Sequence, residues 1–157
     1  MSTALKKVYS EGQLDLVSSI HALEESMLDM PDELHIKEEE YTNHYFAPGV
    51  YARELLIPQG ATLTGKIHKT KHLNIVSKGK IMVASLDGQK IIEAPYVFVS
   101  EPGTKRAGYA LEDTVWVTIH VTEETDVENI EEEVIALDYK DPILLEYFAS
   151  KLIEHKE

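Results

Sequence analysis

The sequence contains no cysteine. Disulfide bonds, iron–sulfur clusters and thiolate zinc sites are therefore excluded, and any metal ion would have to be held by histidine, aspartate or glutamate. The sequence also lacks an apolar run of the roughly 18 residues that a membrane-spanning helix needs. Its first residues, MSTALKKVYSEGQLDL, lack the apolar segment of a signal peptide. We therefore expect a cytoplasmic protein without a membrane partner.

Basic residues are scarce as well. The 157-residue chain carries 15 Lys and Arg against 28 Asp and Glu, which gives a net charge of −13. A general nucleic-acid binder needs a basic face that releases counterions from phosphates, so nucleic acid is disfavoured as a partner. The basic residues are nevertheless clustered, because Lys66, Lys69, Lys71, Lys78 and Lys80 lie in 62–80 with no acidic residue among them. This basic spot predicts either a small anionic ligand or a hairpin whose lysines face water.

Three zones follow one another along a chain of one-domain length. Residues 1–40 predict a helical N-terminal extension, because apolar residues from Leu14 onward recur near a 3.6-residue period until Pro31. Residues 41–122 predict a β-barrel. Residues 123–157 predict a helical C-terminal extension, with one helix capped by Thr125 in a capping box and a second beginning at Asp141-Pro142.

The middle zone consists of short segments rich in β-branched and aromatic residues, separated by turn signals. Asp87-Gly88 is the strongest of these signals, since glycine takes the positive φ that a tight hairpin demands. So many short strands at close spacing indicate a sandwich or barrel. The candidate strands are 49–57, 61–68, 72–77, 79–85, 89–93, 96–100, 105–111 and 114–122.

The stretch GKIHKTKHLNIVSKGK, residues 65–80, matches the spacing of a known motif when it is counted back from Gly79. The motif runs Gly, five residues, His-x-His, three or four residues, Glu, six residues, Gly. His72 then stands at the glutamate position, His68 at the second histidine and Lys66 at the first.

A second motif, Pro-x-Gly-x-x-His, is similar to SEPGTKR at 100–106, with Gly103 in place and Arg106 where the histidine would be. Through these two motifs the middle of the chain resembles the cupin superfamily. The part from YARELLIPQG to TVWVTIHVTEETD is similar to small cupin-like proteins of tailed bacteriophages. The resemblance implies a mainly β fold, a double-stranded β-helix or cupin-like jelly roll with N- and C-terminal helices, whose central cup binds a ligand or a metal.

The resemblance implies three histidines and one glutamate as ligands in a metal-binding cupin, and this chain departs from that set. Lys66 and Arg106 carry only donors when protonated, so they do not coordinate a cation. His120 is a candidate third ligand. In the strand VWVTIHV it shares one face with Trp116 and Thr118, and this face lines the cup if the aliphatic face packs outward against a helix or the other sheet.

One hypothesis follows directly from this histidine set. His68, His72 and His120 would form an open site for one divalent transition metal, zinc, iron, nickel or manganese. The chain would then be a metal-dependent enzyme, an oxygenase or isomerase.

The competing hypothesis is a cup without metal that binds a small molecule, with catalysis not established. Lys66, Arg106 and Arg53 would make a positive interior suited to a small anionic ligand such as a carboxylate, phosphate or sugar nucleotide. Some cupin epimerases work without metal, through a histidine base with a nearby tyrosine and lysine. By that analogy of fold, His68 or His72 would be a general base. The cup wall would include Tyr51, Tyr109 and Trp116.

The same residues also have purely structural explanations. His68 and His72 would then be exposed on a hairpin, and His120 would be a hydrogen-bonded core residue. Arg106 would form an ion pair with Glu54, Glu112 or Asp113. A vestigial cup in a structural phage protein is a third hypothesis, and for a phage protein the compartment would be the host cytoplasm. The remaining histidines, at 21, 35, 44 and 155, are expected at the surface.

The C-terminal helix is more apolar than a monomer of this size requires. We therefore expect a homo-oligomer, a homodimer in the simplest case.

Overall fold

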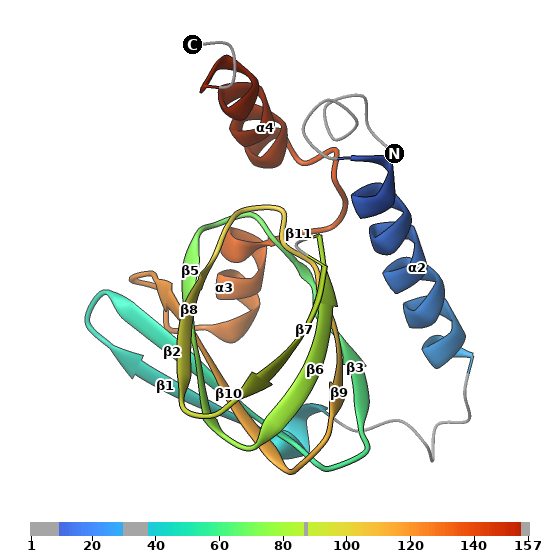
Figure 1. Cartoon of the computed structure of the whole chain (residues 1–157). Helices are drawn as coiled ribbons and strands as arrows, with labels where there is room; N and C mark the ends of the chain where they lie inside the picture. Colours follow the sequence, from blue (N-terminus) through green and yellow to red (C-terminus); the bar gives the residue numbers. More distant parts are fainter. Residues whose placement is uncertain (1–9, 30–37, 87, 155–157) are drawn as a thin grey trace.

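The computed structural model describes residues 10–29, 38–86 and 88–154. Antiparallel strands form a barrel, and α2 (Glu11–Leu28) and α4 (Pro142–Glu154) lie outside it (Figure 1). The strands are β1 (Thr42–Ala47), β2 (Val50–Ile57), β3 (Thr62–Thr64), β4 (Ile67–His68), β5 (His72–Lys78), β6 (Lys80–Ser85), β7 (Gly88–Glu93), β8 (Tyr96–Ser100), β9 (Ala107–Ala110), β10 (Thr114–Val121) and β11 (Ile135–Ala136).

Two sheets make up most of the barrel. The larger has the strand order β1-β2-β10-β5-β8, the smaller has the order β3-β9-β6-β7, and β11 pairs with β4. Side chains alternate between the interior and the outside, as in β6, where Ile81 and Val83 are buried and Met82 is exposed. The predicted fold class, a mainly β jelly roll with helices at both ends, is confirmed.

Two hairpin turns contain glycine. The turn at Gly88 was predicted, whereas the turn at Gly49 joins β2 to a strand that was not predicted. Ser85 pairs with Gly88, whose φ is 99°, so the predicted hairpin joins β6 to β7, although Asp87 lies outside the described residues. The first strand was expected at 49–57, but β1 precedes it and pairs with β2 through a turn at Gly49, φ 76°. Most of β1 is exposed, so it lacks the apolar alternation that marks a half-buried strand.

The helices are α2 (Glu11–Leu28), the short 3-10 helix η2 (Glu38–Tyr41), α3 (Val127–Val134) and α4 (Pro142–Glu154). Pro31, the predicted end of the first helix, lies outside the described residues. Asp126, and not Thr125, caps α3: its carboxylate accepts from the amides of Glu128 and Asn129. The predicted cap was therefore wrong by one residue. A carboxylate at this position accepts hydrogen bonds from two amides and interacts favourably with the positive end of the helix dipole.

The second C-terminal helix begins as predicted. The Asp141 carboxylate accepts from the amide of Ile143 at 2.9 Å, and Pro142 is the first residue of α4. None of the helices in the described ranges is long and apolar enough to cross a membrane.

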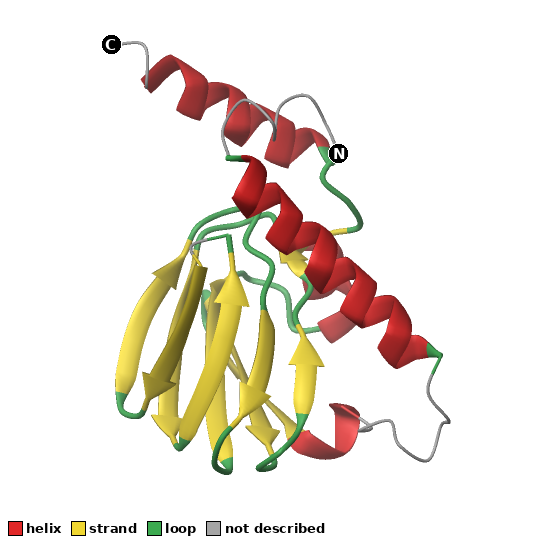
Figure 2. Cartoon of the chain, turned by 45° about the vertical axis from the view of Figure 1, so that its right-hand side comes forward, coloured by secondary structure: helices red, strands yellow, loops and turns green. Residues whose placement is uncertain are grey.

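One apolar cluster joins the two helical zones to the end of the barrel at which α4 lies and α2 begins in Figure 2. It is made of buried side chains from α2, α4, β4, β11 and loops: Leu14, Val17, Ile67, Leu86, Ala136, Tyr139, Leu144 and Phe148. A second cluster fills the barrel interior between the two sheets and includes Ile57, Val76, Ile81 and Val83.

Candidate functional site

The barrel contains a cavity of about 740 Å³. Inward-facing side chains of both sheets line it, and α3 and η2 contribute residues to its rim. As predicted, Trp116, Thr118 and His120 of β10 all face this cavity. Period-2 alternation along one strand is enough to place them there.

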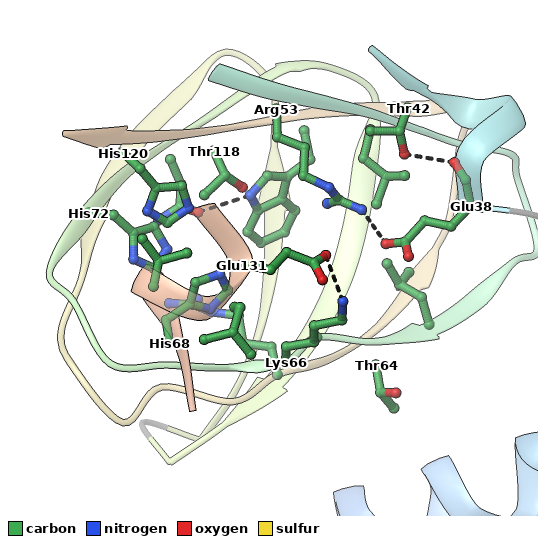
Figure 3. Close-up of a pocket in the computed structure, with 18 of the residues that line it drawn as sticks. Glu38, Thr42, Arg53, Thr64, Lys66, His68, His72, Thr118, His120 and Glu131 are labelled. Atoms are coloured by element: carbon green, nitrogen blue, oxygen red, sulfur yellow. Dashed lines mark hydrogen bonds and ion pairs between the residues drawn. The ribbon is translucent and has the colours of Figure 1, made fainter. Parts of the chain in front are cut away.

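Three histidines from three strands lie together on one side of the cavity (Figure 3). His68 comes from β4, His72 from the start of β5 and His120 from the end of β10. Their ring centres are 4.4 Å apart for His68 and His72, 4.7 Å for His72 and His120, and 5.5 Å for His68 and His120. The structure therefore brings the predicted triad together.

Burial keeps the three imidazoles in the neutral form. It lowers the pKa of His68 to about 2, and the nearby positive charge that His72 and His120 would carry adds to this. Burial likewise lowers the pKa of His120 to about 4 and shifts the pKa of His72 downward. Near neutral pH the rings therefore carry unprotonated nitrogens.

Two of these ring nitrogens have well-defined surroundings. His72 Nδ1 lies 3.1 Å from the carbonyl oxygen of Thr70, so Nδ1 is the donor and Nε2 keeps its lone pair. His120 Nδ1 is fully buried and has no hydrogen-bond partner among the described residues. Such an orphaned nitrogen is uncommon and marks a place where a bound group would be accommodated.

The triad also bears on metal binding. Three neutral imidazoles suit zinc, iron, nickel or manganese in chemistry and in number, since three protein ligands with one open position are typical of catalytic sites. As the side chains stand, however, no group of three or more His, Asp or Glu residues in the described ranges is arranged to hold an ion. The imidazole rings of His68, His72 and His120 would have to rotate before their nitrogens could bind the same ion.

The predicted cations all line the same cavity, and Lys66 and Arg53 have carboxylate partners there. Lys66 Nζ lies 2.8 Å from Glu131 Oε1 of α3, and Arg53 is paired with Glu38 of η2 (Figure 3). The Arg106 guanidinium lies 5.1 Å from the centre of the Phe98 ring. The cup is therefore a mixed-charge cavity and not the purely positive one expected.

The two predicted aromatic ligand residues differ in position. Trp116 lines the cavity, and its indole N–H donates to Asn74 Oδ1 at 3.0 Å, while Asn74 donates to Ser100 at 2.7 Å. Tyr109 is not on the cup wall: it faces outward on β9 beside Met82 and is 41% exposed. Its neighbours in β9, Ala107 and Gly108, are the residues that line the cavity.

Glu54, one predicted partner of Arg106, lies against Asn43 and Tyr45 instead. Three of the other four lysines of the basic spot also have acidic neighbours: Lys69 lies 3.8 Å from Asp141, Lys71 3.3 Å from Glu101 and Lys80 4.0 Å from Glu93. The basic spot of the sequence is therefore largely neutralised in the fold.

Sequence reasoning missed a histidine on the cavity wall. His44 was expected at the surface, and it is exposed, yet it also lines the cavity, where its Nδ1 lies 2.6 Å from the hydroxyl of Tyr51. The Tyr51 ring is stacked near His120, with ring centres 6.3 Å apart, and burial raises the pKa of Tyr51. His44 was missed because β1 was not predicted, and it is the pairing of β1 with β2 that turns His44 inward.

Comparison with protein-family profiles finds no match, and comparison with curated proteins finds none. Comparison of the fold finds solved structures, several of which are described as cupins. A cupin-2 domain protein from Shewanella frigidimarina aligns with a TM-score of 0.43 and 15% identity, over 52% of this chain and 79% of its own. KdgF from Halomonas sp. aligns with a TM-score of 0.47 and 16% identity, over 62% and 96%.

An oxalate decarboxylase from Lactobacillus farciminis aligns with a TM-score of 0.44 and 13% identity, over 62% of this chain and 34% of its own. Likeness at this level carries no argument about activity.

Proposed function

We propose that the barrel cavity binds a small acidic molecule, recognised by the three neutral histidines at one side and by the cations of the rim. The observation that carries this proposal is the placement of His68, His72 and His120 in the same 740 Å³ cavity as Lys66 and Arg106. A cavity of this volume lies within the range of small-molecule sites, about 300–1,000 Å³.

The histidine side of the cavity supplies hydrogen-bond acceptors. A buried polar atom without a partner costs about 1–3 kcal/mol, and His120 Nδ1 is such an atom. A hydroxyl or a protonated acid group on a ligand would donate to an imidazole nitrogen and remove this cost. The histidine side therefore favours a ligand that also carries a donor.

The rim supplies charge. The Lys66–Glu131 pair is half exposed on both sides, so it is worth only about 0.2–1 kcal/mol. An acidic group on a ligand would replace the Glu131 carboxylate on Lys66 at little cost, and the Arg106 guanidinium lines the same cavity. The Glu131 carboxylate thus acts as an internal competitor for the ligand.

A second candidate function is metal binding at the triad. The buried, unpartnered Nδ1 of His120 and the oriented Nε2 of His72 favour it. His68, His72 and His120 would hold one divalent transition metal, which would supply a Lewis acid to the cavity. The surrounding residues would orient the acidic ligand toward the triad.

Two measurements on untagged protein test these candidates. Metal content by mass spectrometry, before and after a His72→Ala substitution, tests for one ion per chain that depends on the triad. Thermal stabilisation by a panel of carboxylates and organic phosphates, with and without chelator, tests ligand binding. We expect stabilisation by at least one acid. No stabilisation by any of them, at millimolar concentration, would overturn the binding proposal.

A substitution at the rim sharpens the test. Glu131→Gln removes the internal competitor, so we expect acids to bind about 2- to 10-fold more tightly by calorimetry. Glu101→Gln is the matched control, since it breaks a similarly exposed pair with Lys71 outside the cavity and should leave the affinity unchanged. Weaker binding in Glu131→Gln would mean that Glu131 contacts the ligand as an acceptor, which contradicts an acidic ligand at Lys66.

A further inference from the structure

The inward side chains of the larger sheet form layers along the barrel, and strand register fixes the order of these layers. In the first layer Tyr51 of β2 pairs with His120 of β10. In the second layer Arg53 pairs with Thr118, which pairs with Asn74 of β5. The first two layers are therefore made of polar and charged side chains.

The next two layers are apolar. Leu55 of β2 pairs with Trp116, which pairs with Val76 of β5. Ile57 pairs with Thr114 one layer further along. None of these five side chains carries a charge, so the polarity of the sheet changes between Arg53 and Leu55, two positions apart on one strand.

Figure 3 shows the two ends of the cavity apart. The three histidines lie together at one side, and Thr42, which pairs with Leu55, lies at the opposite side with Arg53 between them. The cavity therefore has a histidine end and an apolar end.

The smaller sheet contributes to the same apolar end. Leu63 of β3 pairs with Gly108, which pairs with Val83, and all three line the cavity. A Cβ at Gly108 would lie 3.1 Å from Cδ1 of Ile81 and 3.4 Å from Cδ2 of Leu63, so these two side chains lie against the glycine. Ile81, Val83 and Leu63 belong to or pack against the same core cluster as Trp116.

Part of this apolar wall is left uncovered inside the barrel. Leu55, Leu63 and Trp116 line the cavity and pack against the core cluster, yet they are only partly buried. The indole N–H of Trp116 already donates to Asn74 at 3.0 Å, so Trp116 offers its ring to the cavity. Apolar surface in a concave site gains free energy when an apolar group covers it.

The cations lie at the boundary between the two ends. Arg53 belongs to the second layer, and the Arg106 guanidinium lies 5.1 Å from the ring centre of Phe98, which pairs with Asn74 of the same layer. A carboxylate attracted to this layer would place one end of its molecule near the histidines and the other near the apolar wall.

We propose that the acid bound in the cavity is amphipathic, a carboxylic acid whose apolar chain or ring lies against Leu55, Leu63 and Trp116. Its carboxylate then lies toward the Arg53 layer and the histidines. Acids that are polar throughout are disfavoured, because their hydroxyl groups would lose water against the apolar wall. This inference rests on the proposed function, since it takes an acid in the cavity as given.

Calorimetry of the full chain with butanoate, hexanoate and octanoate at neutral pH tests the inference. Each methylene that leaves water for an apolar wall increases the affinity by up to about fourfold. We therefore expect octanoate to bind about 10-fold or more tightly than butanoate.

Two neighbouring leucines provide a matched pair of variants. Leu55→Gln makes the apolar wall polar, whereas Leu56→Gln makes the same change at a residue that does not line the cavity and is 39% exposed. We expect the ratio of octanoate to butanoate affinity to fall about threefold or more in Leu55→Gln and to stay unchanged in Leu56→Gln. Leu63→Gln tests the wall from the smaller sheet, and circular dichroism verifies that each variant is folded.

The outcomes separate this inference from the proposal on which it rests. Equal affinities along the series in wild-type protein would overturn the amphipathic ligand and leave acid binding intact. The same holds if the ratio is unchanged in both Leu55→Gln and Leu63→Gln, or if it falls as much in Leu56→Gln. If these three acids fail to bind while another acid stabilises the protein, this inference alone fails; if no acid binds, the proposed function fails with it.

Discussion

Gly79, from which the histidine motif is counted, is required by the backbone. Its φ is 88°, a backbone angle that residues with a Cβ rarely adopt. A Cβ at this position would also lie 2.8 Å from the Cα of Thr114, which is backbone and cannot turn aside. The turn between β5 and β6 therefore requires glycine at position 79.

Substitution of this glycine is the prediction at the residue scale. Gly79→Ala should lower the free energy of unfolding by about 2–5 kcal/mol, because strain at positive φ adds to a backbone clash. Urea denaturation measures the loss. Gly60→Ala is the control: φ is 83°, but no atom lies within 4 Å of the added methyl, so only the conformational part should be lost. Equal losses in the two variants would contradict the steric explanation.

The attachment of α2 to the barrel depends on a buried lysine. Lys105 is only 3% exposed, and its ammonium donates to the Glu24 carboxylate at 2.6 Å and to the carbonyl of Gly65 at 2.9 Å. Burial alone would raise the pKa of Glu24, but the hydrogen bond and charge of Lys105 outweigh it and lower the pKa. A charged pair thus joins a helix to the barrel loop that carries Arg106.

At the scale of elements, we predict that Glu24→Gln lowers the stability of the protein by about 1–2 kcal/mol at pH 7, since it leaves a buried ammonium with a weaker acceptor. The pKa of Glu24 is lower in the folded state than in the unfolded state. Its contribution is therefore present above the unfolded pKa and is lost as the pH falls through the folded pKa. The stability difference between wild type and Glu24→Gln should shrink in acid.

Chemical denaturation of both proteins from pH 7 to pH 3 measures this difference. Glu25→Gln, an exposed neighbour on the same helix, is the control and should show little change at any pH. A difference that grows toward acid would show that the sign is wrong and that the pair does not stabilise the docking of α2.

At the scale of the whole molecule, the helices and the barrel share one core. Phe148 of α4 is fully buried and touches Gly103, and the same cluster contains Leu14 and Val17 of α2. Phe148 of α4 therefore leaves no room for a side chain at Gly103, the glycine of the second sequence motif. This packing argues that unfolding involves helices and barrel together.

We predict that Phe148→Ala lowers the free energy of unfolding by about 3–5 kcal/mol, as large-to-small substitutions in cores do. Helix and barrel signals, read by far-ultraviolet dichroism and by Trp116 fluorescence, should shift together in one transition. Ile153→Ala on an exposed position of α4 should change little. If only the helical signal shifts in Phe148→Ala, the terminal helices unfold independently of the barrel.

Much of the site was predictable because it depends on local spacing. Alternation along β10 predicted that Trp116 and His120 face inward, and the resemblance to the cupin motif, counted back from Gly79, implied that His68 and His72 lie beside them. Tyr109 shows the limit of that reasoning, since its strand starts at Ala107 and the register turns the tyrosine outward. His44 shows another limit, because an exposed strand has little apolar alternation from which to predict it.

The sequence by itself determined the β-rich middle of the chain and the absence of thiol chemistry, since these follow from composition, period-2 alternation and glycine-defined turns. The cup positions of His68 and His72 were implied by the resemblance to the cupin motif. Only the tertiary structure decided the charge of the cup, because its ion pairs join residues as distant as Lys66 and Glu131, 65 positions apart. It also decided how far the aliphatic side of β10 is covered in the described structure, where Val121 is 87% exposed. Alternation predicts which side chains share a face, but whether another layer covers that face depends on contacts that local spacing does not encode.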